Sequence, residues 1–423
     1  MKKVLSVVVL LLVCAVTYAG GYRVSLQGQR GLAMGHTGVA MVNNAELAFF
    51  NPGGLVHLEG KLNIAVGGFG VFSDVKYQNT EFGQSSQTES PTGTPLYLYA
   101  SYNLSEKFAV GLALYTPYGS TVEYPTDWAG SHLVNNIDLS AIFIQPLFST
   151  QLTEHVSIGG GPILAIGGVN FNRNLSRNLT DIEGNRSNVE IDSQGLTAFG
   201  FSVGAMATVN DKLSFGINYR SRIDIDVEQG DGDATFSNVP DSPLAPITNG
   251  TFDFTATLPL PAEWTLGVSY KATDKLTVNF DYNYAEWDAY EALDIRFLNT
   301  DGSLALESIN PRNYKNASSY RVGAQYDVSS KFVLRAGAYF DESPVQDGFF
   351  APETPRNDSY GFTGGFTFNV TDKLAIDASF LYLTFKEIDA SYDSYIENGQ
   401  RVPFEGTYKS SAFAPGLGLS YKL

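Results

Sequence analysis

The sequence predicts an all-β fold, a fourteen-stranded antiparallel transmembrane β-barrel with an N-terminal plug, or hatch, in its lumen. Three features support this prediction: an export signal at the start, alternating segments longer than soluble strands, and a tight turn that recurs along the chain. Together they predict a multi-pass barrel in the outer membrane of a double-membraned bacterium.

Residues 1–19 have the pattern of a secretory signal peptide. Two lysines follow Met1, an apolar run covers residues 4–16, and Ala19 offers a small residue for cleavage, so Gly20 would start the mature chain. The one cysteine, Cys14, lies inside this segment, and the bulky Val13 before it argues against a lipoprotein anchor. The mature chain would therefore contain no disulfide bonds.

Residues 20–60 do not alternate and are rich in glycine and small side chains. Gly31-Leu-Ala-Met-Gly35 is one such stretch, and the region ends with Asn51-Pro52-Gly53. This region is too apolar for a linker and too long for a simple tail. We expect a compact plug inside the barrel, with a disordered periplasmic tail as the alternative.

Residues 61–423 contain the predicted barrel strands. From Leu213 to Glu228 apolar and polar residues alternate with one exception at Ser221, which indicates one apolar and one polar face. Soluble strands average about 5–6 residues, so this segment better fits a tilted strand that crosses a membrane. A large soluble β-sandwich is the alternative.

A tight connector of polar turn-forming residues recurs between alternating segments. Its six copies are Leu104–Phe108, Leu152–Val156, Val209–Leu213, Ala272–Leu276, Val328–Phe332 and Val370–Leu374. Six tight turns separate seven hairpins, which gives fourteen strands with both ends on the periplasmic side. The longer polar stretches 78–94, 120–135, 229–250 and 342–356 are predicted extracellular loops.

Charge and motifs exclude several functions. The net charge of −17 argues against nucleic-acid binding. The serine of Gly200-Phe-Ser202-Val-Gly204 lies inside an alternating strand, whereas a hydrolase needs it on a strand-to-helix turn. The four histidines show no ligand spacing, and the acidic residues between Asp224 and Asp233 fit a solvated rim better than a cation site. We expect no enzyme activity, no metal and no cofactor.

Several segments together resemble the FadL/TodX family of outer-membrane transporters for long-chain fatty acids and other hydrophobic compounds. They are Gly31–Gly35 with Asn51-Pro52, Tyr219–Ile225, Leu258–Trp264 and Arg335–Pro344. Gly53 departs from the family's Asn-Pro-Ala hatch signature. The resemblance implies a plugged fourteen-stranded barrel, which agrees with the turn count.

The resemblance also implies lateral release through a kink in the third strand, here Phe108 to about Val122. Pro117 lacks a backbone donor and Gly119 weakens pairing, so Pro117, Tyr118 and Gly119 are the predicted kink. A fatty-acid carboxylate would need a basic partner in the lumen. The candidates by position are Arg173, Arg220 and Arg222.

The resulting hypothesis is passive uptake of a hydrophobic ligand, first of all a long-chain fatty acid. The alternatives are a general diffusion porin for polar solutes, a transporter of aromatic hydrocarbons, or an outer-membrane lipase that uses Ser202. Expected partners are the hydrophobic ligand, outer-membrane lipid and the barrel-assembly machinery, and the barrel is expected to be a monomer.

Overall fold

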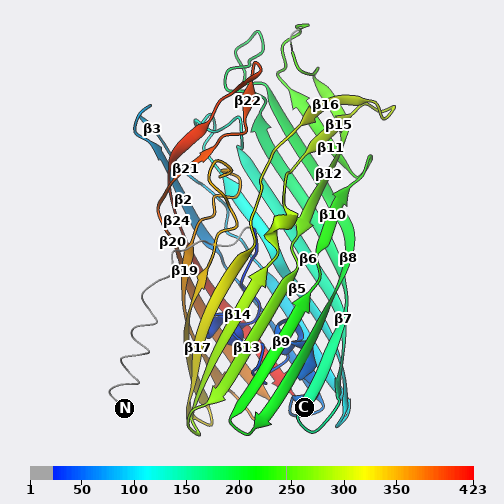
Figure 1. Cartoon of the computed structure of the whole chain (residues 1–423), viewed down its shortest axis with the longest axis vertical. Coiled ribbons are helices and arrows are strands. Elements are labelled where there is room, and N and C mark those ends of the chain that lie inside the picture. The colour runs from blue at the N-terminus through cyan, green and yellow to red at the C-terminus, as the bar shows by residue number, and fades with distance from the viewer. Residues whose placement is uncertain (1–21, 244) are drawn as a thin grey trace.

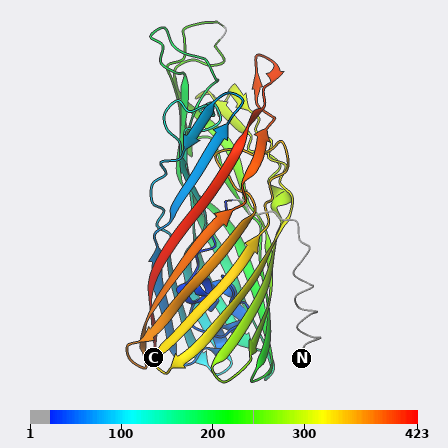
Figure 2. The same cartoon turned by 90° about the vertical axis from the view of Figure 1, so that its left-hand side faces the viewer.

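The computed structural model describes residues 22–243 and 245–423, so the predicted signal peptide and mature start lie outside the described residues. The chain forms one closed barrel, with tight turns at the end where the C-terminus lies and long loops at the other end (Figure 1). A view turned by 90° shows the same tall cylinder and the tilt of its strands (Figure 2). No helix in the described ranges is long and apolar enough to cross a membrane.

The wall consists of fourteen antiparallel strands, as the turn count predicted, and it closes where the first strand pairs with the last. In chain order the wall strands are β1 (Leu62–Phe69) continued by β2 (Phe72–Asn79), β4 (Leu96–Ser105), β5 (Phe108–Glu123), β6 (Asn136–Gln151), β7 (Val156–Asn174), β8 (Asn188–Asn210), β9 (Leu213–Arg220) continued by β10 (Ile223–Val227), β12 (Gly250–Leu260) continued by β13 (Glu263–Lys271), β14 (Leu276–Ala285), β17 (Ala317–Ser329), β18 (Phe332–Asp341), β19 (Ser359–Asn369), β20 (Leu374–Phe385) and β24 (Phe404–Lys422).

Smaller elements extend the wall at the loop end. They are β3 (Gln84–Gln87), β11 (Gly232–Ser237), β15 (Ile295–Leu298), β16 (Leu304–Ser308), β21 (Ile388–Tyr392), β22 (Ile396–Glu397), β23 (Gln400–Arg401) and the 3-10 helix η2 (Trp287–Ala289). The loop end therefore extends far beyond the plug as hairpins and long loops (Figure 1).

Within Leu213–Glu228 the apolar side chains change from the outer face of the wall to the inner face, so this segment is not the single strand that the sequence predicted. We call this change the phase reversal. It divides into β9 and β10 near Ser221. Below the break Phe215 and Ile217 are exposed on the outside, whereas above it Ile225 is buried in the lumen. Beyond the membrane the wall faces water, so apolar side chains there are more stable when they face inward. The upper lumen is consequently apolar.

Residues 22–58 lie inside the lower part of the barrel, and we call this segment the plug (Figure 1). It contains the helices α2 (Gln29–Ala33) and α3 (Leu47–Phe50) and the 3-10 helix η1 (Pro52–His57). Helix α2 contacts β18, β19, β20 and β24, while η1 contacts β5 to β8. The domain limits at residues 20 and 60 remain predictions.

Glycines in the wall let the plug pack closely against it, and we call this packed position of the plug the seated state. A Cβ atom at Gly323 of β17 would lie 2.1 Å from the carbonyl oxygen of Met34, and one at Gly337 of β18 would lie 2.2 Å from the amide nitrogen of Gly35. A Cβ atom at Gly216 of β9 would come 2.0 Å from a plug carbonyl oxygen. The plug backbone therefore packs directly on the wall backbone at these positions, with no gap between them.

Candidate functional site: two cavities and a kinked strand

The hatch signature is a set of contacts between the plug and the wall. The Asn51 amide donates to the carbonyl oxygens of Val39 at 2.7 Å and Ala205 at 2.9 Å, and its oxygen accepts from Gly53 N at 3.0 Å. Pro52 begins η1, which rests on the wall. A Cβ atom at Gly53 would lie 2.8 Å from a wall carbonyl oxygen, so glycine fits here better than the alanine of the family signature.

The third wall strand, β5, is irregular at the predicted kink. Opposite β6 its register shifts between Tyr115 and Tyr118, so Thr116 and Pro117 form a bulge. On its other edge, pairing with β4 ends at Tyr115. A bulge bends a strand and frees part of its edge, and here the freed edge lies between the kink and the loops.

The freed edge of β5 bounds an opening in the wall. Residues 91–95 face Thr116–Val122 there, and no backbone hydrogen bond among the described residues joins these two edges. The plug backbone pairs with β5 instead: Val24 N donates to Pro117 O at 2.8 Å, and Gly119 N donates to Tyr22 O at 3.1 Å. On this edge the kink is therefore stabilised by the plug, whereas β6 pairs with its other edge.

A cavity of about 530 Å³ lies at this opening, and we call it the wall cavity. Inward-facing Leu381 and Leu383 line it from β20, and residues 91–95 and β5 line it at the wall. The exposed Asp138 and Ser140 of β6 also border it, so the cavity continues through the wall. Its size falls within the range of about 300–1,000 Å³ that is usual for ligand sites.

A second, almost wholly apolar cavity adjoins the wall cavity and shares Tyr118, Leu139 and Ser140 with it, and we call it the apolar chamber. Its volume is only about 80 Å³, below the roughly 150 Å³ of an apolar cavity that binds benzene. The side chains that line it include Tyr22, Tyr118, Ile137, Leu139, Val169, Phe171, Ile191, Leu196, Ile225, Val227, Phe254, Leu258, Leu260, Tyr290, Leu293 and Ile295. The phase reversal of the upper strands creates this lining.

Two tyrosines separate the chamber from the wall cavity. Tyr118 of the kink borders both cavities, and its ring centre lies 6.1 Å from that of Tyr22 in the plug. Tyr22 also packs edge-on against Trp287 with ring centres 4.9 Å apart. Both tyrosines are buried. A ligand that moves between the cavities must displace this aromatic partition.

The partition is held by a buried ionic cluster, which we call the clamp: Arg23, Glu263, Asp341 and Tyr118. Arg23 donates to Glu263 at 3.1 Å and lies 3.5 Å from Asp341. The Tyr118 hydroxyl donates to the other Glu263 oxygen at 2.9 Å. Arg23 also bonds Asn283 and Ser319. Glu263 thus connects the kink of β5 to the N-terminal end of the plug.

The structure separates the three candidate arginines. Arg173 of β7 lines a small cavity that shares Phe171 and Leu293 with the apolar chamber. Its guanidinium donates to His132 O at 3.1 Å and Ser308 Oγ at 2.9 Å. No carboxylate forms an ion pair with it among the described residues. Arg173 is therefore a cation beside the chamber that forms no ion pair in the described residues, while Glu353 of the same small cavity pairs with Arg312.

Arg220 and Arg222 do not reach the chamber. Arg220 is buried under the plug, where it lies 4.0 Å from Glu263 and stacks on Phe49, with 4.6 Å between Cζ and the ring centre. The expectation that Arg222 lines the lumen is wrong: it is exposed and pairs at 2.7 Å with Asp224. The phase reversal at this point of the wall turns Arg222 outward.

A loop over residues 124–135 covers the upper lumen. Its His132 is buried, and neither ring nitrogen has a hydrogen-bond partner in the described residues. The ring packs on Tyr395, with centres 4.5 Å apart. Burial, with nearby Arg173 and Arg177, lowers the pKa of His132 to about 3. The closed loop therefore holds a neutral imidazole.

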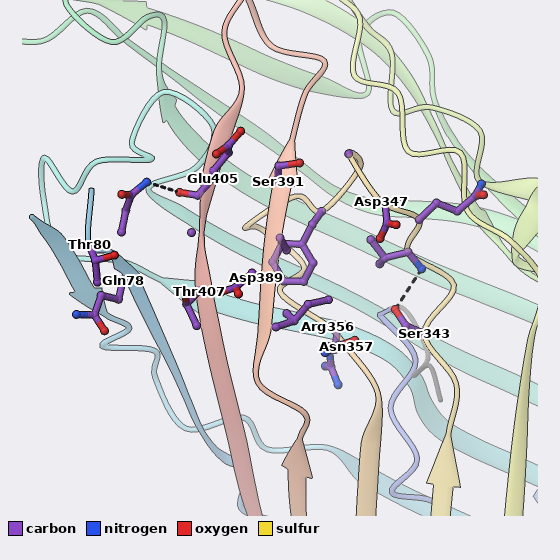
Figure 3. Close-up of a pocket in the computed structure, with 18 of the residues that line it drawn as sticks. Gln78, Thr80, Ser343, Asp347, Arg356, Asn357, Asp389, Ser391, Glu405 and Thr407 are labelled. Atoms are coloured by element: carbon purple, nitrogen blue, oxygen red, sulfur yellow. Dashed lines mark hydrogen bonds between the residues drawn. The ribbon is translucent and has the colours of Figure 1, made fainter. Parts of the chain in front are cut away.

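A third cavity, of about 510 Å³, lies at the loop end, and we call it the outer polar cavity (Figure 3). Side chains of β2, β21, β24 and the segment after β18 surround it. Four of its lining residues are acidic, namely Glu81, Asp347, Asp389 and Glu405. Figure 3 shows Arg356 and Asn357 together at its lower end, away from Ser391 and Glu405.

Sequence reasoning missed Tyr22, Arg23 and Glu263, which carry the partition and the clamp. Arg23 and Glu263 are separated by 240 positions along the chain. Only the packing of the plug inside the closed barrel brings them together. The one available signal was a lone arginine next to a tyrosine just after the predicted cleavage site, in a stretch with no other charge until Arg30.

Comparisons with known proteins agree with this architecture. The chain is 27% identical to the 47 kDa outer membrane protein of Pasteurella multocida (strain Pm70), over 96% of this chain and 94% of that protein. It is 20% identical to the long-chain fatty acid transport protein of Escherichia coli (strain K12), over 97% of this chain and 98% of that protein.

Solved structures share the fold at low identity. A Pseudomonas aeruginosa FadL homologue matches with a TM-score of 0.79 and 17% identity, over 95% of this chain and 99% of that one. The P. putida toluene transporter TodX matches with a TM-score of 0.73 and 17% identity, over 94% and 98% of the two chains. The model of the family described as "Outer membrane protein transport protein (OMPP1/FadL/TodX)" matches residues 10–423, so the chain belongs to this family of outer-membrane transport proteins.

Proposed function

We propose that this barrel takes up long-chain fatty acids passively and releases them sideways into the membrane at the kink of β5. The observation that carries the proposal is the wall cavity, which is large enough for a ligand and continues outward at the edge of β5 that pairs with no neighbouring strand. The apolar chamber lies next to it behind the Tyr22–Tyr118 partition.

The seated plug argues against a straight path to the periplasm. Its backbone packs on wall glycines, and Asp281 accepts the amides of Gly38 at 2.8 Å and Val39 at 3.1 Å. The partition, by contrast, consists of two backbone hydrogen bonds, aromatic contacts and the clamp. A ligand therefore meets less resistance through the wall than through the plug. The same seal argues against a diffusion porin.

Arg173 is the proposed partner of the fatty-acid carboxylate. It is the candidate arginine that has no ion pair and lies beside the chamber. A charge-assisted hydrogen bond contributes about 1.5–3 kcal/mol, so its loss should weaken binding on the order of tenfold to a hundredfold. The chamber must expand to admit a chain, because it is nearly filled in this structure.

The test is binding of a radiolabelled long-chain fatty acid to the purified barrel in detergent, beside the alcohol of the same chain length. Arg173→Gln should weaken fatty-acid binding and leave alcohol binding unchanged, and Arg222→Gln on the outer face should change neither. Equal loss for both ligands, or no loss, would contradict the carboxylate role. Failure of both ligands to bind would remove the fatty-acid proposal altogether.

An aromatic hydrocarbon is the second candidate cargo. The small volume of the chamber and its ring-rich lining, with Tyr22, Phe171 and Phe254, favour a compact neutral ligand. Toluene added as a competitor separates the two proposals. Displacement of the fatty acid by toluene at low concentration would favour the hydrocarbon, whereas an unaffected fatty-acid signal would favour the acid.

A further inference from the structure

The wall cavity contains two arginines, and their surroundings differ. Arg23 belongs to the clamp, where Glu263 and Asp341 balance its charge. Arg356 lies in the segment between β18 and β19, and within the described residues its guanidinium forms no hydrogen bond and no ion pair. The guanidinium lies over the Phe385 ring, with 5.8 Å between Cζ and the ring centre. An arginine is charged at any physiological pH. Asp341 of the clamp lies within electrostatic range of Arg356 but pairs with Arg23, and no carboxylate among the described residues forms an ion pair with Arg356.

Arg356 lies where two cavities meet. It lines both the wall cavity and the outer polar cavity, and in Figure 3 it lies at the lower end of the latter. Below it Leu381, Leu383 and Phe385 give the wall cavity an apolar side. Above it Asp347, Asp389 and Glu405 give the outer cavity an acidic lining. A cation at the boundary of an apolar and an acidic space favours an anionic head at that boundary.

From this geometry we infer a second ligand site, distinct from Arg173, for an amphiphile with an anionic head. Arg356 holds the head, and the tail lies along the apolar side of the wall cavity next to the opening. The acidic outer cavity above repels the anionic head, so the ligand stays at the level of the wall opening. This inference rests on the proposed lateral release and gives the cargo a binding site just before it enters the membrane.

The anionic head could come from a transported fatty acid or from a phosphate-bearing lipid that enters through the wall from the membrane. Both sources share the acyl chain and the anion, and both would contact Arg356 in the same way. Ser73 of β2 offers a reporter for either one, because it is exposed and lines the wall cavity. The chain's one cysteine, Cys14, lies in the predicted signal peptide, so Ser73→Cys would be the single thiol of the mature protein.

The experiment measures alkylation of Ser73→Cys by N-ethylmaleimide in the purified mature barrel. Dodecanoate should protect this thiol at a concentration roughly tenfold or more below that of dodecan-1-ol, because only the acid gains a charge-assisted bond. Arg356→Gln should remove that difference and Arg356→Lys should keep part of it. Arg222→Gln is the matched control and should change nothing. The unheated gel mobility of each variant checks that the barrel has folded.

Equal protection by acid and alcohol with Arg356 intact overturns the inference, and so does a difference that survives Arg356→Gln. A second reporter, Ala256→Cys in the chamber, separates this failure from failure of the proposed function. Protection of the chamber alone leaves the transport proposal standing without the Arg356 site, whereas protection of neither thiol removes both. In phosphatidylcholine vesicles, protection on adding phosphatidic acid alone identifies the membrane lipid as the source of the head, and protection that requires dodecanoate identifies the cargo.

Discussion

Replacing Gly323 by alanine should unseat the plug and let ions pass through the barrel. The new Cβ atom would lie 2.1 Å from the carbonyl oxygen of Met34 and 2.5 Å from its Cβ atom. All three of the nearest atoms belong to Met34 in the plug, so the clash affects plug seating before it affects the wall. The strand hydrogen bonds of β17 do not involve a side chain and should persist.

The magnitude follows from overpacking. Adding a methylene-sized group to a tight contact costs about 1–3 kcal/mol. If that cost applies only to the seated state, the unseated fraction rises about 5–150-fold. Gly337→Ala should act similarly, but the two costs should not add, because both glycines contact Met34.

Single-channel recording in a planar bilayer provides the assay. The unaltered barrel should open rarely, and Gly323→Ala should open far more often. Gly364→Ala on β19 is the matched control, because its nearest contact would be a wall carbonyl oxygen at 3.8 Å and it does not touch the plug. If Gly323→Ala opened as rarely as Gly364→Ala, the view that glycine packing seals the lumen would be refuted.

Three further predictions concern the partition, the kink and the loop. Arg23→Gln should raise the alkylation rate of a cysteine placed at Val24 about a hundredfold or more, because breaking a buried ion pair costs about 3–5 kcal/mol. Adding Glu263→Gln should restore part of the protection. Full protection of the cysteine in Arg23→Gln alone would disprove the clamp. Gly119→Phe should narrow the wall cavity and slow fatty-acid release into vesicles while chamber binding persists, whereas unchanged release would place the exit elsewhere. The pKa of His132 is about 3 in the closed loop, so protonation of the imidazole favours the open loop once the pH falls below the ordinary histidine value. Between pH 7 and 5 this favours opening by about 2 kcal/mol. Proteolysis of residues 124–135 should therefore rise over that range, and His132→Phe should remove this pH dependence.

The sequence predicted the wall well because its signals are local. Each tight turn carries its own polar residues, and each strand of the lower barrel alternates between lipid and lumen. The strand count and the position of β5 follow from counting those signals. The phase reversal escaped prediction because Ser221 resembled a single exception to the pattern, and periodicity alone does not show on which side of the wall water replaces lipid.

The site was less predictable because its contacts join distant segments. Arg222 was expected in the lumen because its face was extrapolated through the break between β9 and β10. Arg220 does face inward, but the plug covers it. Arg356 gave no signal, since it lies in a loop where alternation says nothing about side-chain direction. The missing information was the side-chain direction beyond the break for Arg222, the position of the plug for Arg220 and the conformation of the loop for Arg356.

The plug is attached in two ways, and this difference explains how a barrel can release an apolar ligand without leaking ions. Residues 29–58 pack against wall glycines over a broad area, while Tyr22–Val24 is held by two backbone bonds to the kink and by the clamp. The two attachments can therefore fail separately. Arg23→Gln should expose the partition without raising conductance, and Gly323→Ala should raise conductance. If Arg23→Gln also conducts ions freely, the plug moves as one body and release through the wall does not occur with the lumen still sealed.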